Sequence, residues 1–539
     1  MAPRGPLEAP SSASSEHGGS PLRRAELLAA LSLAGDLGMG RPLEGAQRTA
    51  IVAVALGRAA ELPARDLKDA YYLAFLRNVG CTADAPLAAD VFGGDEIEAR
   101  GWLALADWSK PTDVIRILMR NIGAGKSAMQ RARLTANLFI KMPRLNRTAE
   151  SHCEVAQSLA DDLGCTVRVR EALGYSFERW DGKGVPRKKK GDAIPLAMRL
   201  VQVADDAQAF HRVGGVDAAV AMLAARAGKA LDPTLAATAR AGAAELLAGA
   251  DVSSVWDAAI AAEPGVPDYV DETAIDPALQ AMGAFADLKS SYTRGHSMGV
   301  AELATGAAER LGLTPEAVAD VRRAAYVHDV GRAGVAASVW EKEGPLTDGE
   351  WEKVRMHASY TERILARPPL LARLGTLGAL DHERLDGNGY PHQRAAESLP
   401  PGARVLAAAD MYQAMRETRP HRRAISREEI AATLESEAEK GRLDRDAVRA
   451  VLETAGHRVE RGRARGSGNG GYPGGLTDPE VEVLRLVARG LTNKAVAVKL
   501  AIPARTVGHH LAHAYEKIGV TTRDGAAMFA MKNGIVGAV

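Results

Sequence analysis

FERWDGKGVP (177–186) and HERLDGNGYP (382–391) are two versions of one loop within a single chain of 539 residues. Two further matches lie at the same offset of 205 residues. MRLVQVAD ends at Asp205 where ARVLAAAD ends at Asp410, and His152 matches His357. Three matches at one spacing make a chance resemblance improbable, so the sequence predicts a duplicated module.

The upstream halves of the two copies align only after a gap. AAYVHDVGRAG (324–334) matches YYLAFLRNVGCTA (71–83), and His296 matches Gly45, both at an offset of 251 residues. The first copy therefore carries about 46 extra residues between its halves. In this alignment Arg77-Asn78 of the first copy takes the place of His328-Asp329.

Apolar residues recur at helical spacing along most of the chain, for example in 299–313 and 427–441. Thr314 and Pro315 form a helix start, with the threonine as N-cap and the proline at the first helical position. No convincing run of alternating strand residues occurs. The predicted fold class is all-α, with two tandem helical modules followed by a small helix-turn-helix domain.

Composition and the repeat set the predicted domain boundaries. They are a disordered N-terminus at 1–21, a degenerate first copy at 22–250, a connector at 251–275, a second copy at 276–457, a flexible Gly/Arg-rich linker at 458–475 and the helix-turn-helix domain at 476–539. Because such a linker cannot transmit rigid-body motion, we expect the modules to control the last domain through dimerisation or by covering its DNA-binding face.

The overall composition excludes several classes of protein. With 68 Lys and Arg against 67 Asp and Glu, the net charge of +1 argues against a uniformly basic nucleic-acid coat. Three cysteines cannot form a disulfide framework, which favours a reduced, cytoplasmic compartment. No apolar stretch approaches the roughly 20 residues of a membrane-spanning helix, and the N-terminus lacks the apolar core of a signal peptide.

The second copy contains residues that suit a metal centre: His296, His328, Asp329, His357, Asp381, His382 and Asp410. Imidazole and carboxylate groups together favour divalent transition metals. Adjacent helix residues diverge by about 100°, so His328-Asp329 can serve two neighbouring metals that the carboxylate bridges. Two metals could activate a water and neutralise a phosphoryl group. Any one of these residues is more often a packed histidine or a helix cap, but the adjacent Gly-rich loop strengthens the set.

Together, these residues and the loop HERLDGNGYP resemble the HD-GYP phosphohydrolases over roughly residues 276–457. The resemblance implies an all-helical domain that binds two or three metals, usually iron or manganese, and hydrolyses cyclic di-GMP. It makes the seven residues metal ligands, Asp329 and Arg332 catalytic, and Arg332, Tyr390 and Arg419 substrate-binding. The chain departs from the family at Asp381 (usually His), Arg332 (usually Lys) and Tyr292 (Glu in trinuclear members), so two metals are expected.

The first copy resembles the same HD-GYP module after decay. It keeps His152 and Asp205 but has Gly45, Arg77-Asn78 and Phe177 where the other ligands would stand. Two scattered ligands cannot hold a dimetal centre, so we expect no catalysis there. The first copy is then either a packing partner for the second or a small-molecule sensor.

Residues 476–539 carry eight Lys and Arg, five Asp and Glu and three histidines. Short helices separated by Gly490 and the 502–504 turn fit a helix-turn-helix, although a protein-interaction module would also be helical. The segment strongly resembles the LuxR-type DNA-binding domain. The resemblance implies phosphate contacts by Thr492, Asn493, Lys494, Arg505, Thr506 and Lys517, and base-edge contacts by Gly508, His509 and Ala512.

The sequence therefore predicts a cytoplasmic transcriptional regulator in which an HD-GYP-like module senses or hydrolyses a nucleotide and controls a DNA-binding domain. The predicted partners are double-stranded DNA, bound as a homodimer, and a cyclic dinucleotide or another phosphorylated small molecule, with no membrane. The alternative is a catalytically inactive sensor of nucleotide or metal. The sequence leaves open whether the module turns over its ligand.

Overall fold

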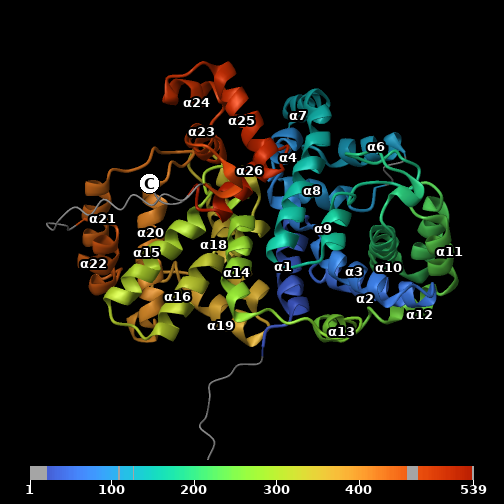
Figure 1. The fold of residues 1–539 in the computed structure, drawn as a ribbon, viewed down its shortest axis with the longest axis horizontal. Coiled ribbons are helices and arrows are strands. Elements are labelled where there is room, and N and C mark those ends of the chain that lie inside the picture. The colour runs from blue at the N-terminus through green and yellow to red at the C-terminus, as the bar shows by residue number, and fades with distance from the viewer. Residues whose placement is uncertain (1–20, 107–109, 125–126, 458–471, 537–539) are drawn as a thin grey trace, which may run out of the picture.

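The computed structural model describes residues 21–106, 110–124, 127–457 and 472–536. These residues are helical almost throughout, and they form isolated β-bridges but no β-strand (Figure 1). The all-α prediction is confirmed. The predicted disordered N-terminus and most of the predicted linker lie outside the described residues.

The first module consists of α1 to α12 together with three 3₁₀ segments. Their bounds are α1 (Arg24–Gly38), α2 (Gly45–Ala59), α3 (Ala64–Leu76), η1 (Val79–Thr82), α4 (Ala85–Phe92), α5 (Glu96–Leu103), α6 (Pro111–Asn121), α7 (Ala128–Lys141), η2 (Met142–Arg144), α8 (Leu145–Asp162), α9 (Val167–Leu173), η3 (Gly191–Ala193), α10 (Leu196–Arg226), α11 (Pro233–Ala241) and α12 (Ala243–Ala248).

A connecting helix, the second module and the C-terminal domain follow. Their elements are α13 (Val255–Ala261), α14 (Glu272–Asp287), α15 (His296–Arg310), α16 (Pro315–Val327), η4 (Val330–Gly334), α17 (Ala337–Trp340), α18 (Asp348–Leu365), α19 (Pro369–Gly378), η5 (Ala396–Ser398), α20 (Pro401–Arg416), α21 (Arg427–Glu439), α22 (Arg445–Thr454), η6 (Pro473–Gly475), α23 (Asp478–Ala488), α24 (Asn493–Leu500), α25 (Ala504–Ile518) and α26 (Arg523–Lys532).

The local signals identified in the sequence begin these helices as expected. The backbone N–H of Ala317 donates to the Thr314 hydroxyl at the start of α16 (3.3 Å), and that of Ala495 donates to Thr492 at the start of α24 (3.3 Å). Such caps satisfy N–H groups that have no partner within the helix.

Equivalent glycines make equivalent close contacts in the two modules. A Cβ on Gly80 of η1 would lie 2.1 Å from the carbonyl oxygen of His152, and one on Gly331 of η4 would lie 2.0 Å from that of His357. In both modules only glycine allows the 3₁₀ segment to press against the histidine-bearing helix, α8 or α18. Backbone packing therefore supports the duplication that the sequence predicts.

The glycine-rich loops of the two modules are also built alike. Glu178 accepts hydrogen bonds from the backbone N–H groups of Arg187 (2.6 Å) and Lys189 (3.0 Å). Glu383 accepts from those of His392 (2.6 Å) and Arg394 (2.9 Å), each exactly 205 positions later. The extra residues of the first module lie between its two halves and form mainly α5, α6 and α7.

The modules pack around their first helices, α1 and α14, each of which contacts both η1 and η4. Helix α1 also packs on α18 of the second module, and α14 packs on α8 of the first. The interface is therefore pseudo-symmetric, and one hydrophobic cluster runs through both modules.

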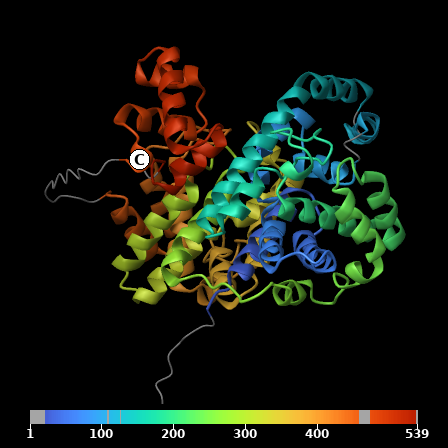
Figure 2. The same cartoon turned by 45° about the vertical axis from the view of Figure 1, so that its right-hand side comes forward.

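The C-terminal domain docks directly on both modules through α26, which packs on α8 and α14 (Figures 1 and 2). Lys532 of α26 pairs with Asp162 (2.5 Å), and Glu154 of α8 accepts from the backbone N–H of Thr522 (3.0 Å). Arg294 of the second module pairs with Asp524 (2.5 Å). The C-terminal domain therefore contacts both modules directly. The sequence had predicted control only through dimerisation or by covering the DNA-binding face.

Candidate functional site

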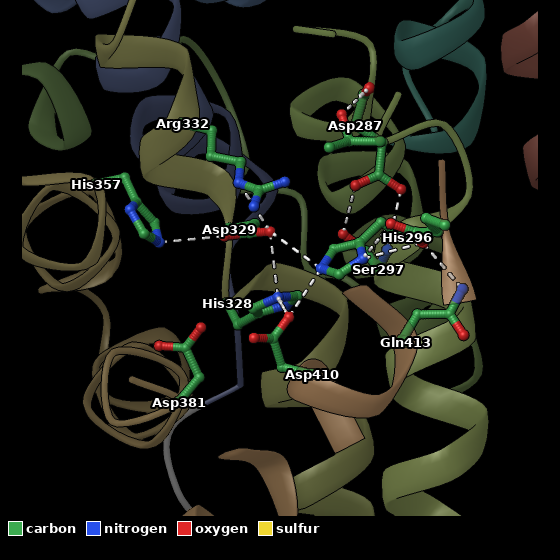
Figure 3. Close-up of polar contacts among 12 residues, drawn as sticks. Asp287, His296, Ser297, His328, Asp329, Arg332, His357, Asp381, Asp410 and Gln413 are labelled. Carbon is green, nitrogen blue, oxygen red and sulfur yellow. Dashed lines mark hydrogen bonds and ion pairs between the residues drawn. The ribbon is translucent and has the colours of Figure 1, made fainter. Parts of the chain in front are cut away.

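All seven predicted metal ligands come together in the second module (Figure 3 labels six of them). His296 is the first residue of α15, His328 and Asp329 follow α16, His357 lies within α18, and Asp410 lies within α20. Asp381 and His382 follow α19. Six of the seven are buried, and His382 is half-buried.

Three histidines have one ring nitrogen already occupied by a protein acceptor. Nδ1 of His328 donates to the carbonyl oxygen of Ala325 (2.8 Å), and Nδ1 of His357 donates to that of Val354. Nδ1 of His296 lies 3.1 Å from both carboxylate oxygens of Glu417. Because a carbonyl can only accept, Nδ1 carries a proton in both rings, so in the neutral form Nε2 of His328 and of His357 presents a lone pair to the site, as a metal ligand must.

Asp329 lies between the two ends of the site. Its Oδ2 is 3.2 Å from Nε2 of His328 and 3.5 Å from Nε2 of His296, whereas its Oδ1 is 3.3 Å from Nε2 of His357. One carboxylate thus faces two groups of ligands with different oxygens. This is the arrangement that the sequence predicted for a bridging carboxylate.

The candidate ligand atoms divide into neighbouring groups. His296, His328 and Asp410 form one, with Nε2 of His296 2.9 Å from Oδ1 of Asp410. His357, Asp381 and His382 form another, in which the two Nε2 atoms of His357 and His382 are 3.1 Å apart. Two unprotonated nitrogens at that distance repel each other unless a proton or a metal ion lies between them.

Both carboxylate oxygens of Asp381 are buried and make no hydrogen bond with any described residue, and Nε2 of His328 and the Asp329 oxygens have only ion-pair contacts without hydrogen-bond geometry. Such groups are rare and costly in native proteins. Burial raises the pKa of Asp381 well above its usual range, and Asp410 adds to the effect. A cation would remove both penalties, so the residues present fit a metal centre.

The surrounding charges also favour a cation. Burial opposes protonation of His296, but Glu417 and Asp410 outweigh it and raise the pKa of His296 to about 9. This positive charge can be supplied by a proton or by a metal ion. At the other end, burial and the neighbouring His357 lower the pKa of His382 to about 3, which keeps that ring neutral.

The predicted substrate-binding residues differ in their surroundings. Nε of Arg332 lies 3.0 Å from Oδ2 of Asp329, its guanidinium stacks 4.7 Å from the ring of Trp340, and its Nη1 has no described partner. Tyr390 stacks on His382, with ring centroids 4.7 Å apart. Arg419 pairs with Glu417 (2.8 Å), so it adjoins the His296 end of the site through that carboxylate.

Sequence reasoning missed Glu417, which holds His296 and itself accepts hydrogen bonds from Gln413 (2.9 Å) and Arg419. Glu417 is seven residues after Asp410, a spacing that returns to the same face of a helix. It also missed Asp287, whose carboxylate accepts from the backbone N–H (3.0 Å) and hydroxyl (2.8 Å) of Ser297 and so fixes the start of α15 (Figure 3).

The equivalent place in the first module is filled by protein cations. Asp205, which matches Asp410, pairs with Arg41 (2.5 Å) and with Arg77, the residue that matches His328. Nε2 of His152 bonds to the carbonyl oxygen of Arg77 (2.9 Å), so the nitrogen equivalent to Nε2 of His357, a candidate ligand, is occupied here. His152 also packs edge-on against Phe177.

The C-terminal domain has the core that the sequence predicts, with Val483, Leu486, Val487 and Val496 buried and Leu500 partly buried. Of the nine predicted DNA contacts, Lys494, Arg505, His509 and Ala512 are exposed on α24 and α25, and Gly508 is half-buried. Neither Lys494 nor Arg505 forms an ion pair with a described residue. Thr492 caps α24, and Thr506 is half-buried. Lys517 pairs with Glu480 (2.7 Å), and Asn493 accepts from Arg523.

Two family models match the chain. An HD domain model matches residues 141–235 and 279–447, and a model of bacterial regulatory proteins of the luxR family matches residues 475–530. The first match covers parts of both modules, in agreement with the duplication. Among the described residues, no helix is long and apolar enough to cross a membrane.

Known phosphodiesterases are similar to the chain. A 3′3′-cGAMP-specific phosphodiesterase 3 of Vibrio cholerae is 27% identical over 76% of this chain and 90% of its own length. A cyclic di-GMP phosphodiesterase of Thermotoga maritima is 30% identical over 29% of this chain and 44% of its own length. A crystal structure of the Vibrio cholerae cyclic GMP-AMP-specific phosphodiesterase V-cGAP3 has a TM-score of 0.56 at 23% identity, over 82% of this chain and 99% of that one.

Proposed function

The chain contains an HD domain and a LuxR-family helix-turn-helix domain, and on that premise we propose that it is a DNA-binding regulator that hydrolyses a cyclic dinucleotide. The observation that carries the catalytic half is the Asp329 carboxylate between two groups of histidine nitrogens. The similar phosphodiesterases, which act on 3′3′-cGAMP or cyclic di-GMP, indicate the substrate class. A DNA-binding role makes a cytoplasmic location the natural one.

In this proposal the seven clustered residues hold two divalent metals, with iron or manganese favoured. When bound, such metals activate a water and neutralise charge on a phosphoryl group. Arg332 supplies a guanidinium with an unpaired N–H beside the ligands, which suits a phosphate oxygen. Tyr390 offers an aromatic surface at the His382 end, and Arg419 adds positive charge near His296.

The test compares purified wild type with Asp329→Ala in iron or manganese, with 3′3′-cGAMP and cyclic di-GMP as substrates. We expect linear dinucleotide product from the wild type and none from Asp329→Ala. Asn78→Ala, the matched position of the first module, serves as the control and should keep full turnover. Absence of product from the wild type with every metal and both substrates would contradict the enzymatic proposal.

A catalytically inactive sensor is the second candidate, because Asp381 and Arg332 stand where the HD-GYP phosphohydrolases usually have His and Lys. In that case the wild type would bind metal and dinucleotide, as measured by calorimetry, without forming product. Binding that is lost in Asp329→Ala would place the ligand at this site.

The DNA-binding half rests on the exposed cations of α24 and α25, where Lys494 and Arg505 have no ion-pair partner among the described residues. Full-length protein should bind duplex DNA with a steep dependence on salt concentration, since each phosphate contact releases counterions. The double variant Lys494→Ala/Arg505→Ala should bind more weakly and with a shallower slope. No binding of the wild type at low salt would refute this half.

A further inference from the structure

Helices α6 and α7, called the basic hairpin below, have no counterpart in the second module and lie in a strongly basic stretch of the sequence, residues 110–147. Nine residues of this stretch are Lys or Arg and one is Asp, so its net charge is +8 in a chain whose total is +1. The rest of the chain is therefore net acidic. A near-neutral average conceals a segment whose charge is typical of nucleic-acid-binding surfaces.

Part of the charge of this basic hairpin is neutralised, since Lys141 of α7 pairs with Asp90, but three of its arginines are exposed. Arg116 and Arg120 lie one turn apart on α6, and Arg133 lies on α7. Arg116 has one exposed ion pair, with Asp113 (3.3 Å), and neither Arg120 nor Arg133 forms an ion pair with any residue that the structure describes. Free guanidinium groups on two adjacent helices suit the oxygens of a phosphate backbone.

The basic hairpin is anchored as a fixed projection. Leu118 of α6, Ile122 directly after it and Leu138 of α7 belong to a separate hydrophobic cluster that also contains Val91 of α4. Below it, Glu96 of α5 accepts from the ammonium group of Lys289 in the second module (2.8 Å), and both side chains are fully buried. Arg116, Arg120 and Arg133 are therefore held on folded helices that pack on the first module, next to α5, which is tied to the second module.

The basic hairpin lies on the same side of the molecule as the helix-turn-helix. In Figure 1, α7 lies at the top of the first module, with α6 slightly lower and to its right, and α24 and α25 lie at the top of the C-terminal domain. Figure 2, which is turned about the vertical axis, shows that the helix-turn-helix and the hairpin stand apart, at opposite ends of this upper side. We propose that the basic hairpin is a second DNA-binding surface, which contacts the phosphate backbone of the same duplex that the helix-turn-helix binds. This inference rests on the DNA-binding half of the proposed function.

An anionic membrane is the rival ligand, because the same helices expose apolar side chains. Met129 and Ile140 of α7 are 83% and 77% exposed, and basic helices with exposed apolar residues also bind lipid surfaces. Duplex DNA is favoured because the cations occur on both helices and on the side of the molecule where the recognition helix α25 projects. A single extended polyanion can reach both.

The experiment measures binding of full-length protein to a duplex of about three helical turns, about 30 base pairs, at several salt concentrations. The test variant is Arg116→Ala/Arg120→Ala/Arg133→Ala. The control removes three exposed arginines from α18, α19 and the turn between them, at the opposite end of the molecule: Arg363→Ala/Arg367→Ala/Arg373→Ala. Thermal unfolding of both variants verifies that each remains folded.

We expect the test variant to lose about tenfold or more in affinity, with a salt slope lower by about 0.9 per lost phosphate contact. The control should bind as the wild type does. If the two variants bind equally and Lys494→Ala/Arg505→Ala is still defective, the proposed role of the basic hairpin is wrong and that of the helix-turn-helix stands. No DNA binding by the wild type overturns the proposed function as well. If the test variant binds DNA as the wild type does but no longer binds phosphatidylglycerol vesicles, the ligand of the basic hairpin is a membrane and not DNA.

Discussion

The two HD modules place a buried carboxylate at the same position and neutralise it in different ways. In the first module Asp205 pairs with Arg41 and Arg77. In the second, Asp410 faces His296 and His328, whose nitrogens carry charge only when a proton or a metal is present. The first module thus has an arginine, Arg77, at the position of His328. The arginine is a permanent cation, whereas the histidine needs a proton or a metal ion to supply the positive charge.

The largest expected effect is that of removing the Asp205 carboxylate, which pairs with two arginines in the first module. Asp205→Asn leaves two arginines buried without their partner and should cost about 3–5 kcal/mol of unfolding free energy at pH 7. Burial opposes ionisation of Asp205, yet Arg41 and Arg77 hold its pKa below the usual range. The stabilisation is thus complete above about pH 4, the unfolded value, and is lost as the pH falls further.

Denaturant unfolding between pH 2 and pH 7 measures this effect. The wild type should lose stability over the acid part of that range, and the difference between wild type and Asp205→Asn should shrink there. A difference that stays constant with pH would show that the arginines do not depend on ionised Asp205.

Metal removal should act on the second module alone. A ligand at 100 times its dissociation constant stabilises the folded state by about 2.7 kcal/mol, so chelation should cost the second module about that much. Hydrogen exchange would locate the loss in α15, α16 and α18, with α2, α3 and α8 unchanged. Equal loss of protection in both modules would break the comparison.

The matched glycines separate packing from ligand placement. Gly331→Ala and Gly80→Ala each force a methyl group against a histidine carbonyl, which should cost about 1–3 kcal/mol in either module. Only Gly331→Ala displaces a ligand-bearing helix, so only it should also lower metal affinity. Calorimetric metal titration of both variants distinguishes the two outcomes, and equal affinities would contradict this assignment.

The smallest expected effect concerns Glu417. Because it orients His296 through Nδ1, Glu417→Gln should weaken metal binding by about 10- to 100-fold with little change in thermal stability. Glu302→Gln, on the same module but away from the ligands, provides a control. An unchanged metal affinity in Glu417→Gln would remove the positioning role.

Much of this comparison was predictable from the sequence. The repeat placed His296, His328 and His357 in one copy and Gly45, Arg77 and His152 in the other, and the structure brings each set to equivalent positions. Helix starts at Thr314 and Thr492 were equally clear, because N-caps are local signals. Such features depend on residues that are close in sequence or that repeat at a fixed offset.

Contacts that join distant segments were not predictable. Glu417 meets His296 across 121 residues, and the docking of α26 depends on Glu154 and Asp162, more than 350 residues away. Neither contact has a motif or a periodicity. The basic hairpin was visible as an insertion, but its exposure and its position on the same side of the molecule as the helix-turn-helix depend on tertiary packing.

The two residues before His296 lie at the boundary between the site and the C-terminal domain. Arg294 pairs with Asp524, and Gly295 lies so close to the carbonyl oxygen of Val536 that a Cβ there would be 2.7 Å from it. Free energies around a thermodynamic cycle must sum to zero. If docking of the C-terminal domain changes the metal affinity of the site, metal binding must therefore change the docking equilibrium by the same free energy. The same rule makes the effect of metal on DNA affinity equal to the effect of DNA on metal affinity.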